Sequence, residues 1–301
     1  MTGPVQITAV GAGAVAIGGS NYAPITTHVS YAGRPAVSWP HRVGVVPPVA
    51  AGYQARTDPA AELDRVFGAA SGAAVLTGVV SGMGGVGKTQ LAAAYAHRLW
   101  DAGGVDLLVW LTASGRDAVL TGYAQAGADV ASPVEGEDTD QVAQRFLAWL
   151  AATDRRWLVV LDDLADPADL RGLWPQGRSG RALVTTRRRD AALADRGTVI
   201  DVGLFTPGEA VAYLTGRLDP GGRCPERLVE AGELAEDLGR LPLALAQAAA
   251  YMQDRDLTCA AYRQRLARRR LELALRRTRP PTTTPPRWPP PGRYQSRRPT
   301  E

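Results

Sequence analysis

The sequence contains little cysteine, histidine or lysine. Its 301 residues include two cysteines, three histidines and a single lysine. Two cysteines are too few for a disulfide framework. The histidines lie far apart in the sequence and do not have the spacing of metal ligands. The composition therefore excludes a disulfide-stabilised scaffold and gives no sign of a histidine-based metal site.

The sequence also lacks a long apolar run. The longest strongly apolar stretch, Leu241–Ala250, is shorter than a bilayer crossing requires and contains Pro242. The apolar start, Val5–Ile17, is not preceded by the basic residues of a signal peptide, because the first basic side chain is Arg34. We therefore expect a cytoplasmic protein with no membrane partner.

A net positive charge is found only in the C-terminal part. The chain has a net charge of +4, but residues 263–301 contain 12 arginines and two glutamates, so residues 1–262 carry −6. The high isoelectric point therefore belongs to the tail, and no aromatic platform is interleaved with its arginines. For these reasons we do not expect nucleic acid to be a partner.

Strand and helix patterns alternate over residues 56–205. Short apolar runs, typical of parallel strands buried on both faces, occur at Ala74–Val80, Leu107–Leu111, Trp157–Leu161, Ala182–Thr185 and Thr198–Val202. Helical patterns occur at Glu62–Ala70, Thr89–Trp100 and Thr139–Ala152. The alternation predicts an α/β fold of the P-loop NTPase type, in which helices flank a doubly wound parallel sheet.

The remaining segments differ from this pattern. Helical patterns alone follow residue 206, at Pro207–Leu218, Pro225–Leu238, Leu241–Gln253 and, strongly basic, Leu257–Arg277. We predict a small helical subdomain at residues 206–275. Residues 1–55, which are rich in small residues and broken by proline, are predicted to form a flexible N-terminal segment. The Arg/Pro-rich residues 276–301 are predicted to be a disordered tail.

The single lysine, Lys88, lies in a G-x-x-x-x-G-K-T segment between a predicted strand and a predicted helix. The segment consists of Gly82, Met83, Gly84, Gly85, Val86, Gly87, Lys88 and Thr89, and Gln90 follows it. This context is typical of a P-loop, whose backbone N–H groups surround phosphate oxygens. We expect Lys88 to reach the β- and γ-phosphates of a nucleotide and the Thr89 hydroxyl to bind Mg²⁺.

A second candidate element is the apolar strand that ends in Asp162 and Asp163. By itself such an ending is more often a plain transition from strand to loop. After a P-loop, it is typical of a Walker B element, in which Asp162 would hold Mg²⁺ through its water shell. Asp163 would orient or activate the attacking water, or serve as a second acidic group near the metal.

Two further segments are ambiguous by themselves. Arg187 follows a predicted strand, so it faces the edge of the sheet where ligands bind and could sense a γ-phosphate. The alternative is a solvated arginine run, because Arg188 and Arg189 follow. Pro242, within Gly239–Leu245, could lie near the nucleotide or simply start a helix.

In this order, the four segments resemble the NB-ARC class of STAND nucleotide-switch ATPases. G-M-G-G-V-G-K-T is similar to the P-loop of that family, L-V-V-L-D-D to its Walker B element and V-T-T-R to its sensor 1 segment. G-R-L-P-L-A is similar to its G-L-P-L-A motif, with Arg240 in place of the usual leucine. The N-terminal tract and the arginine usage resemble actinobacterial regulators of this class.

The resemblance, which covers roughly residues 56–270, implies binding of ATP/ADP and Mg²⁺, with ADP holding a closed state. By the same resemblance, Lys88 and Thr89 bind phosphates and metal, Asp162 and Asp163 complete the catalytic acids, and Arg187 senses the γ-phosphate. Pro242 would lie near the nucleotide. The segment Tyr53–Arg56 resembles the adenine-contacting segment of the family only weakly.

The C-terminus departs from the family, whose members continue into a winged-helix subdomain with a Met-His-Asp motif and then into repeats. No histidine follows His97. We therefore expect a truncated or frame-shifted product whose ordered part ends near residue 275.

The leading functional hypothesis is an ATP/ADP-binding signalling switch with weak Mg²⁺-dependent hydrolysis. One alternative is a nucleic-acid-acting ATPase that uses the basic tail, and another is a nucleotide-binding remnant without switching activity. The upstream signal, the protein partner and self-association are left open.

Overall fold

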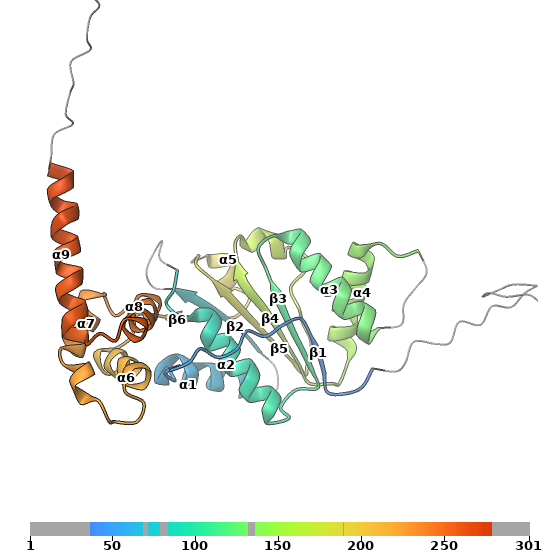
Figure 1. The fold of residues 1–301 in the computed structure, drawn as a ribbon. Helices are drawn as coiled ribbons and strands as arrows, with labels where there is room; N and C mark the ends of the chain where they lie inside the picture. Colours follow the sequence, from blue (N-terminus) through green and yellow to red (C-terminus); the bar gives the residue numbers. More distant parts are fainter. Residues whose placement is uncertain (1–36, 69–71, 79–83, 132–135, 189, 279–301) are drawn as a thin grey trace, which may run out of the picture.

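A computed structural model describes residues 37–68, 72–78, 84–131, 136–188 and 190–278 (Figure 1). In this part of the chain, one parallel sheet has the strand order β1-β3-β4-β5-β2-β6. The strands are β1 (His41–Val43), β2 (Gly72–Gly78), β3 (Leu107–Thr112), β4 (Trp157–Leu164), β5 (Gly180–Thr186) and β6 (Thr198–Val202). Strand β5 lies between β2, which precedes the P-loop, and β4, which contains Asp162 and Asp163. The segment that follows β5 therefore lies between the P-loop and the two acids.

Helices cover both faces of the sheet (Figure 1). The helices of this α/β part are α1 (Thr57–Phe67), α2 (Lys88–Asp101), α3 (Arg116–Val130), α4 (Thr139–Ala152), the 3-10 turn η1 (Pro167–Leu170) and α5 (Ala191–Ala194). Successive residues of a strand point to opposite faces. Leu107 and Val109 accordingly pack with residues of α3 and α4, whereas Leu108 and Trp110 pack with residues of α1 and α2. The alternation explains why these strands are apolar at every position.

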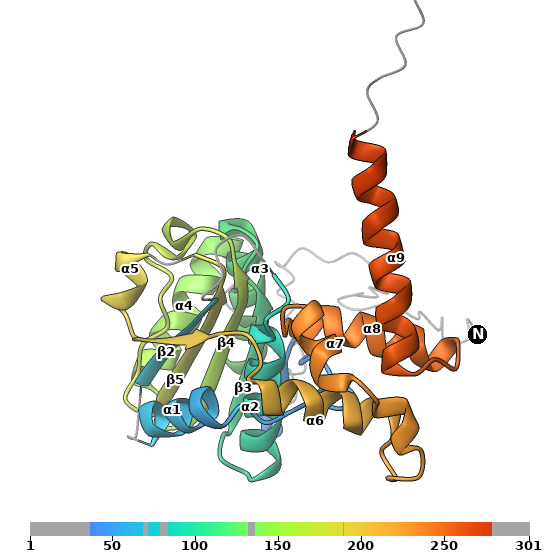
Figure 2. The same cartoon turned by 90° about the vertical axis from the view of Figure 1, so that its left-hand side faces the viewer.

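A helical subdomain follows the sheet and has a hydrophobic core of its own. It consists of α6 (Pro207–Leu218), the 3-10 turn η2 (Pro225–Leu228), α7 (Ala231–Asp237), α8 (Pro242–Asp254) and α9 (Cys259–Thr278). Figures 1 and 2 show α6, α7 and α8 grouped at one end of the molecule, with α9 projecting away from it. The first helix of this subdomain, α6, begins with Pro207 and a capping box between Thr206 and Glu209. The sheet and the helices of this subdomain therefore meet along one boundary.

The structure confirms the predicted fold class, a parallel sheet flanked by helices and followed by helices alone. Within the segment of residues 1–55 that the sequence predicts to be flexible, His41–Val43 form the edge strand β1 beside β3. Val43 and Val46 are buried in the body, which anchors this segment. Residues 1–36 lie outside the described part.

Two helix predictions need correction in their bounds. Pro225–Leu238 is not one helix, because Glu230 has a left-handed backbone (φ 66°) and separates η2 from α7. The predicted helix Glu62–Ala70 is shifted, because α1 covers Thr57–Phe67. Helix α9 ends at Thr278, within one residue of the predicted Arg277, and residues 279–301 lie outside the described part. No helix within the described ranges has both the length and the apolarity needed to cross a membrane.

Candidate functional site

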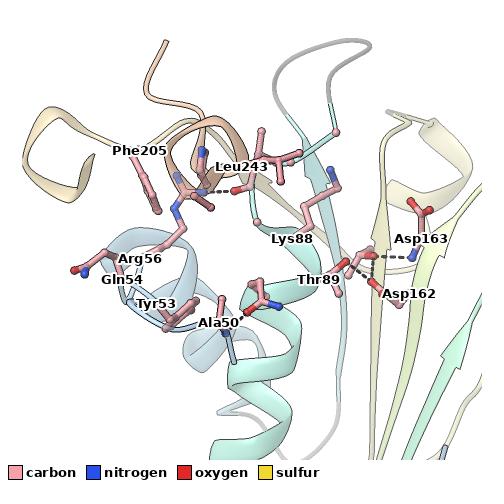
Figure 3. Close-up of a pocket in the computed structure, with 18 of the residues that line it drawn as sticks. Ala50, Tyr53, Gln54, Arg56, Lys88, Thr89, Asp162, Asp163, Phe205 and Leu243 are labelled. Carbon is pink, nitrogen blue, oxygen red and sulfur yellow. Dashed lines mark hydrogen bonds between the residues drawn. The ribbon is translucent and has the colours of Figure 1, made fainter. Parts of the chain in front are cut away.

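A cavity of about 510 Å³ lies where the carboxyl ends of the strands meet the helical subdomain (Figure 3). It is lined by Ala50, Tyr53, Gln54, Arg56, Gly84, Gly85, Val86, Gly87, Lys88, Thr89, Gln90, Thr112, Asp162, Asp163, Thr185, Arg187, Phe205, Tyr213, Pro242, Leu243 and Ala246. Its volume is within the range of small-molecule sites, which combine apolar walls with a few polar groups.

The glycine-rich turn before α2 forms one wall of the cavity. Gly85 and Gly87 have φ angles of 94° and 96°, a backbone region that residues with side chains rarely adopt. The turn leads directly into α2, whose first N–H groups have no partner within the helix and carry partial positive charge. Gly82 and Met83, two of the predicted binding residues, lie outside the described residues.

The side chain of Lys88 extends into the cavity, and only 8% of the residue is exposed (Figure 3). Burial lowers the pKa of its ammonium group, and the charge of Arg187 lowers it further, whereas Asp163 and Asp162 act in the opposite direction. A buried cation gains more from a neighbouring anion than an exposed cation does, because water screens the pair less. The position of Lys88 therefore suits an anionic ligand.

Thr89 connects the start of α2 to the end of β4. Its Oγ1 donates a hydrogen bond of 2.9 Å to Oδ1 of Asp162, which is 9% exposed. Hydroxyl and carboxylate oxygens are ligands that Mg²⁺ prefers. Among the described residues no group of three or more His, Cys, Asp and Glu could hold a metal. Bound Mg²⁺ would therefore take further oxygens from water or from a phosphate, as it usually does.

Asp163 and Arg187 form an ion pair at the mouth of the cavity. Arg187 Nε lies 3.3 Å from Asp163 Oδ1, and the two side chains are 63% and 53% exposed. Arg187 also lies beside the glycine turn, since a Cβ added to Gly84 would be 3.5 Å from its guanidinium carbon. Asp163 has φ 55° and lies in an irregular part of β4, where the pairing with β5 shifts between Leu161 and Leu164.

The start of α8 contacts the glycine turn. Pro242 is the first residue of α8 and lines the cavity. The backbone N–H of Leu243 donates a hydrogen bond of 3.1 Å to the carbonyl oxygen of Gly85. A Cβ at Gly85 would lie only 2.6 Å from the Cβ of Leu243, so this approach requires glycine. The helical subdomain is therefore tied to the loop that forms the cavity wall.

Gln90 holds the N-terminal segment against α2. Its Oε1 accepts a hydrogen bond of 2.6 Å from the N–H of Ala50, and its Nε2 donates one of 3.4 Å to the carbonyl of Pro48. Gln90 still lines the cavity. The predicted binding residue therefore also positions the segment that forms the opposite wall.

The end of the cavity beside α1 contains residues that the sequence did not identify as site residues. Arg56 is 4% exposed and donates hydrogen bonds to the carbonyl oxygens of Val86 (2.9 Å) and Leu204 (2.5 Å). Its guanidinium carbon lies 5.0 Å from the centre of the Phe205 ring. Burial lowers the pKa of Arg56, whereas Glu209 and Tyr53 act to raise it. The arginine thereby joins the glycine turn to the chain that leads into α6.

The structure thus brings Lys88, Thr89, Asp162, Asp163 and Arg187 together at one cavity, with Pro242 on its rim. For the end of the cavity that contains Arg56, the weak resemblance at Tyr53–Arg56 was the only indication of a binding site in the sequence. Thr185 belongs to the V-T-T-R segment but received no role from the sequence, and nothing in the sequence pattern singled out Phe205 or Tyr213.

Comparison with known proteins gives a consistent family. A model of the NB-ARC domain family matches residues 67–216, about half of the chain. Regulatory protein AfsR of Streptomyces coelicolor is 34% identical over 199 residues, which are 62% of this chain and 19% of that protein. A nucleotide-binding leucine-rich repeat (NLR)-like protein of Hyaloscypha variabilis is 29% identical over 203 residues, 61% of this chain and 20% of that protein.

A solved structure with a similar fold is a STAND protein with a tetratricopeptide repeat sensor from Pyrococcus horikoshii. It has a TM-score of 0.46 and 17% identity, over 70% of this chain and 31% of that one. The chain spans about a fifth of the length of the two curated relatives. From the family match and the P-loop, the chain belongs to the NB-ARC-type STAND P-loop NTPases, whose nucleotide-binding fold it shares.

Proposed function

We propose that this chain is a nucleotide-dependent switch that binds ADP and ATP together with Mg²⁺ and hydrolyses ATP weakly. The main observation behind the proposal is the hydrogen bond from Thr89 to Asp162 beside the buried ammonium of Lys88. This arrangement places a cation for phosphate and a hydroxyl for the metal at the first turn of α2, next to a carboxylate for the metal near the end of β4.

In this proposal the glycine turn and Lys88 bind the β- and γ-phosphates. Thr89 and Asp162 would hold Mg²⁺, which would neutralise charge that develops on the phosphate oxygens. The aromatic wall formed by Tyr53 and Phe205 would receive the planar base, at the end of the cavity away from Lys88.

Asp163 and Arg187 would distinguish ATP from ADP. In the structure they neutralise one another at 3.3 Å. A γ-phosphate would compete with Asp163 for Arg187, because phosphate and carboxylate bind guanidinium in the same bidentate manner. Release of Asp163 would leave its carboxylate available to orient a water molecule. Hydrolysis would be weak because the Asp163 side chain is 53% exposed, so bulk water competes with the attacking water for its carboxylate oxygens.

The switch would operate between an α/β domain at residues 56–205 and a helical subdomain at 206–275. The hydrogen bond from Leu243 to Gly85 supports this proposal, since it connects α8 to the phosphate-binding turn. A nucleotide in the cavity would contact both parts, so ADP and ATP could favour different arrangements of the two. Pro242, on the rim, would lie near the nucleotide.

A regulatory role is supported by two relatives, one called a regulatory protein and the other NLR-like. We propose a cytoplasmic signalling role in which the partner is another protein or a second copy of the chain. The matched stretch is only about a fifth of each relative, so their complete activities do not transfer to this chain by similarity alone.

Titration calorimetry with ADP and ATP, each with and without Mg²⁺, tests the proposal. The purified chain should bind both nucleotides, and Lys88→Ala should weaken binding at least tenfold, about 1.4 kcal/mol. Lys88→Met, which keeps most of the side-chain length, should do the same without emptying the pocket. Arg65→Ala, at a side chain that is 72% exposed, is the matched control for loss of one positive charge.

Equal affinity in wild type and both Lys88 variants would contradict the proposed site. Absence of nucleotide binding by the wild type would contradict the function as a whole. Hydrolysis is tested separately by phosphate release, and Asp163→Asn should abolish release while nucleotide still binds.

A further inference from the structure

The irregularity between β4 and β5 places one residue of β5 opposite both acids. Leu161 pairs with Val184 and Leu164 pairs with Thr186, so Asp162 and Asp163 together oppose Thr185. Two residues opposite one is the defining feature of a β-bulge, which bends a strand and redirects its side chains. At this bulge the two neighbouring acids, which a regular strand would direct to opposite faces, both line the cavity.

The hydroxyl of Thr185 binds both residues of the bulge. Its Oγ1 donates a hydrogen bond of 2.6 Å to Oδ1 of Asp162 and accepts one of 2.8 Å from the backbone N–H of Asp163. Thr185 is only 1% exposed, so water does not compete for these bonds. One hydroxyl therefore orients the carboxylate of the first acid and the backbone of the second.

Both acids need such support. Asp163 has φ 55°, a left-handed backbone region that is uncommon for residues with a side chain. Asp162 Oδ1 accepts hydrogen bonds from Thr89 and from Thr185, which together fix the direction of the carboxylate. Side chains that orient metal-binding groups in this way commonly influence metal affinity strongly.

We propose that Thr185 is a positioning residue for the Mg²⁺-nucleotide site, acting on the metal through Asp162 and on the attacking water through Asp163. The inference rests on the proposed function and adds to it a residue whose hydroxyl is bound to the two acids. It predicts that the contribution of Mg²⁺ to nucleotide affinity depends on this hydroxyl.

The neighbouring Thr186 offers a matched control. It is 0% exposed, and its Oγ1 donates to the carbonyl of Leu164 (2.9 Å) and accepts from the N–H of Arg188 (3.1 Å). Thr186→Val therefore removes one donated and one accepted hydrogen bond from a buried position of the same strand, as Thr185→Val does. Thr185→Ser keeps the hydroxyl and should retain the function.

The experiment measures ADP and ATP affinity by fluorescence titration in EDTA and in Mg²⁺ for wild type and the three variants. We expect Thr185→Val to bind nucleotide in EDTA as wild type does and to lose about tenfold or more of the affinity gained with Mg²⁺. Thr185→Ser and Thr186→Val should keep that gain. Thermal unfolding of each variant without ligand checks that the two valine variants are folded and similarly stable.

An unchanged Mg²⁺ effect in Thr185→Val would overturn this inference and leave the proposed function intact. An equal loss in Thr186→Val would also overturn it, since the effect would then come from weakening the strand. If Thr185→Val does not fold, the test uses Thr185→Ser, which keeps the hydroxyl. A folded serine variant that gains less affinity from Mg²⁺ than wild type does would contradict a role of the hydroxyl alone. Wild type that binds no nucleotide would overturn both proposals.

Discussion

At the scale of single residues, two charged groups of the cavity, Arg187 and Asp163, are paired with each other. Arg187 lies 3.3 Å from Asp163, and both side chains are largely in water. An exposed pair of this kind contributes only about 0–1 kcal/mol to folding. Its importance should therefore lie in ligand discrimination, because the arginine can exchange the carboxylate for a phosphate at little cost in stability.

We predict that Arg187→Ala weakens ATP binding several-fold, leaves ADP binding nearly unchanged and changes the free energy of unfolding by no more than about 1 kcal/mol. Competition titrations with the two nucleotides and urea unfolding measure these effects. Arg188→Ala is the control, because Arg188 forms a similar exposed pair with Asp166 at 2.9 Å. An equal loss for ATP and ADP would count against a role in sensing the third phosphate.

The polar site residues could be predicted from the sequence because their chemistry depends on local spacing. Lys88 and Thr89 belong to one continuous motif, and Asp162 ends an apolar strand. The role of Thr185 could not be predicted, because it depends on a bulge in the pairing of two strands. Arg56 and Phe205 are 149 residues apart in number and meet only in the folded chain, so no pattern within a short window reveals them.

At the scale of elements, the helical subdomain begins at a well-defined helix terminus. Thr206 Oγ1 accepts from the N–H of Glu209 (3.2 Å), and Glu209 Oε2 accepts from the N–H of Thr206 (2.7 Å). The capping box and Pro207 together fix where α6 starts, directly after Phe205 at the cavity. The cap should therefore support both the helix and one wall of the cavity.

We predict that Thr206→Ala lowers the free energy of unfolding by about 1 kcal/mol, because the first turn of α6 loses its acceptor. Thr206→Ser should retain nearly all of the stability. Urea unfolding followed by circular dichroism measures both variants. A serine variant as unstable as the alanine variant would show that the methyl group, rather than the cap, supplies the stabilisation.

The elements that the sequence missed are those with weak local signals. Strand β1 has three residues and depends on its pairing with β3 across the sheet. The predicted helix Pro225–Leu238 is divided because Glu230 has a left-handed backbone, and its carboxylate accepts from Arg263 of α9 at 2.6 Å. Long, strongly periodic helices such as α4 were predicted correctly because their own residues suffice to define them.

At the scale of the whole molecule, the cavity lies between two hydrophobic cores: the one that α1 and α2 form with the sheet, and the core of the helical subdomain. One contact between these parts is the hydrogen bond of 3.1 Å from Leu243 N–H to the carbonyl oxygen of Gly85. A ligand that touches both the α/β part and the helical subdomain should therefore stabilise the two parts together, since a ligand that binds only the folded state increases the free energy of unfolding.

We predict that ADP at one hundred times its dissociation constant adds about 2.7 kcal/mol to the free energy of unfolding and slows tryptic cleavage after Arg187. Cleavage after Arg269, whose side chain is 67% exposed on the projecting helix α9, should continue at the same rate. Mass spectrometry of timed digests measures both sites in one sample. Protection of both sites alike, or of neither, would contradict a ligand held in this cavity.

Because Lys88 is the single lysine of the sequence and is buried, its side chain can serve as a spectroscopic reporter of the cavity. A chain with one lysine, grown with lysine labelled at its ε-carbon, gives one signal from that group, and no assignment is needed. The frequency of that signal depends on the protonation and surroundings of the ammonium group of a residue that is 8% exposed. One resonance therefore reports whether the cavity is empty or filled, and with which nucleotide, in a sample that carries no foreign label.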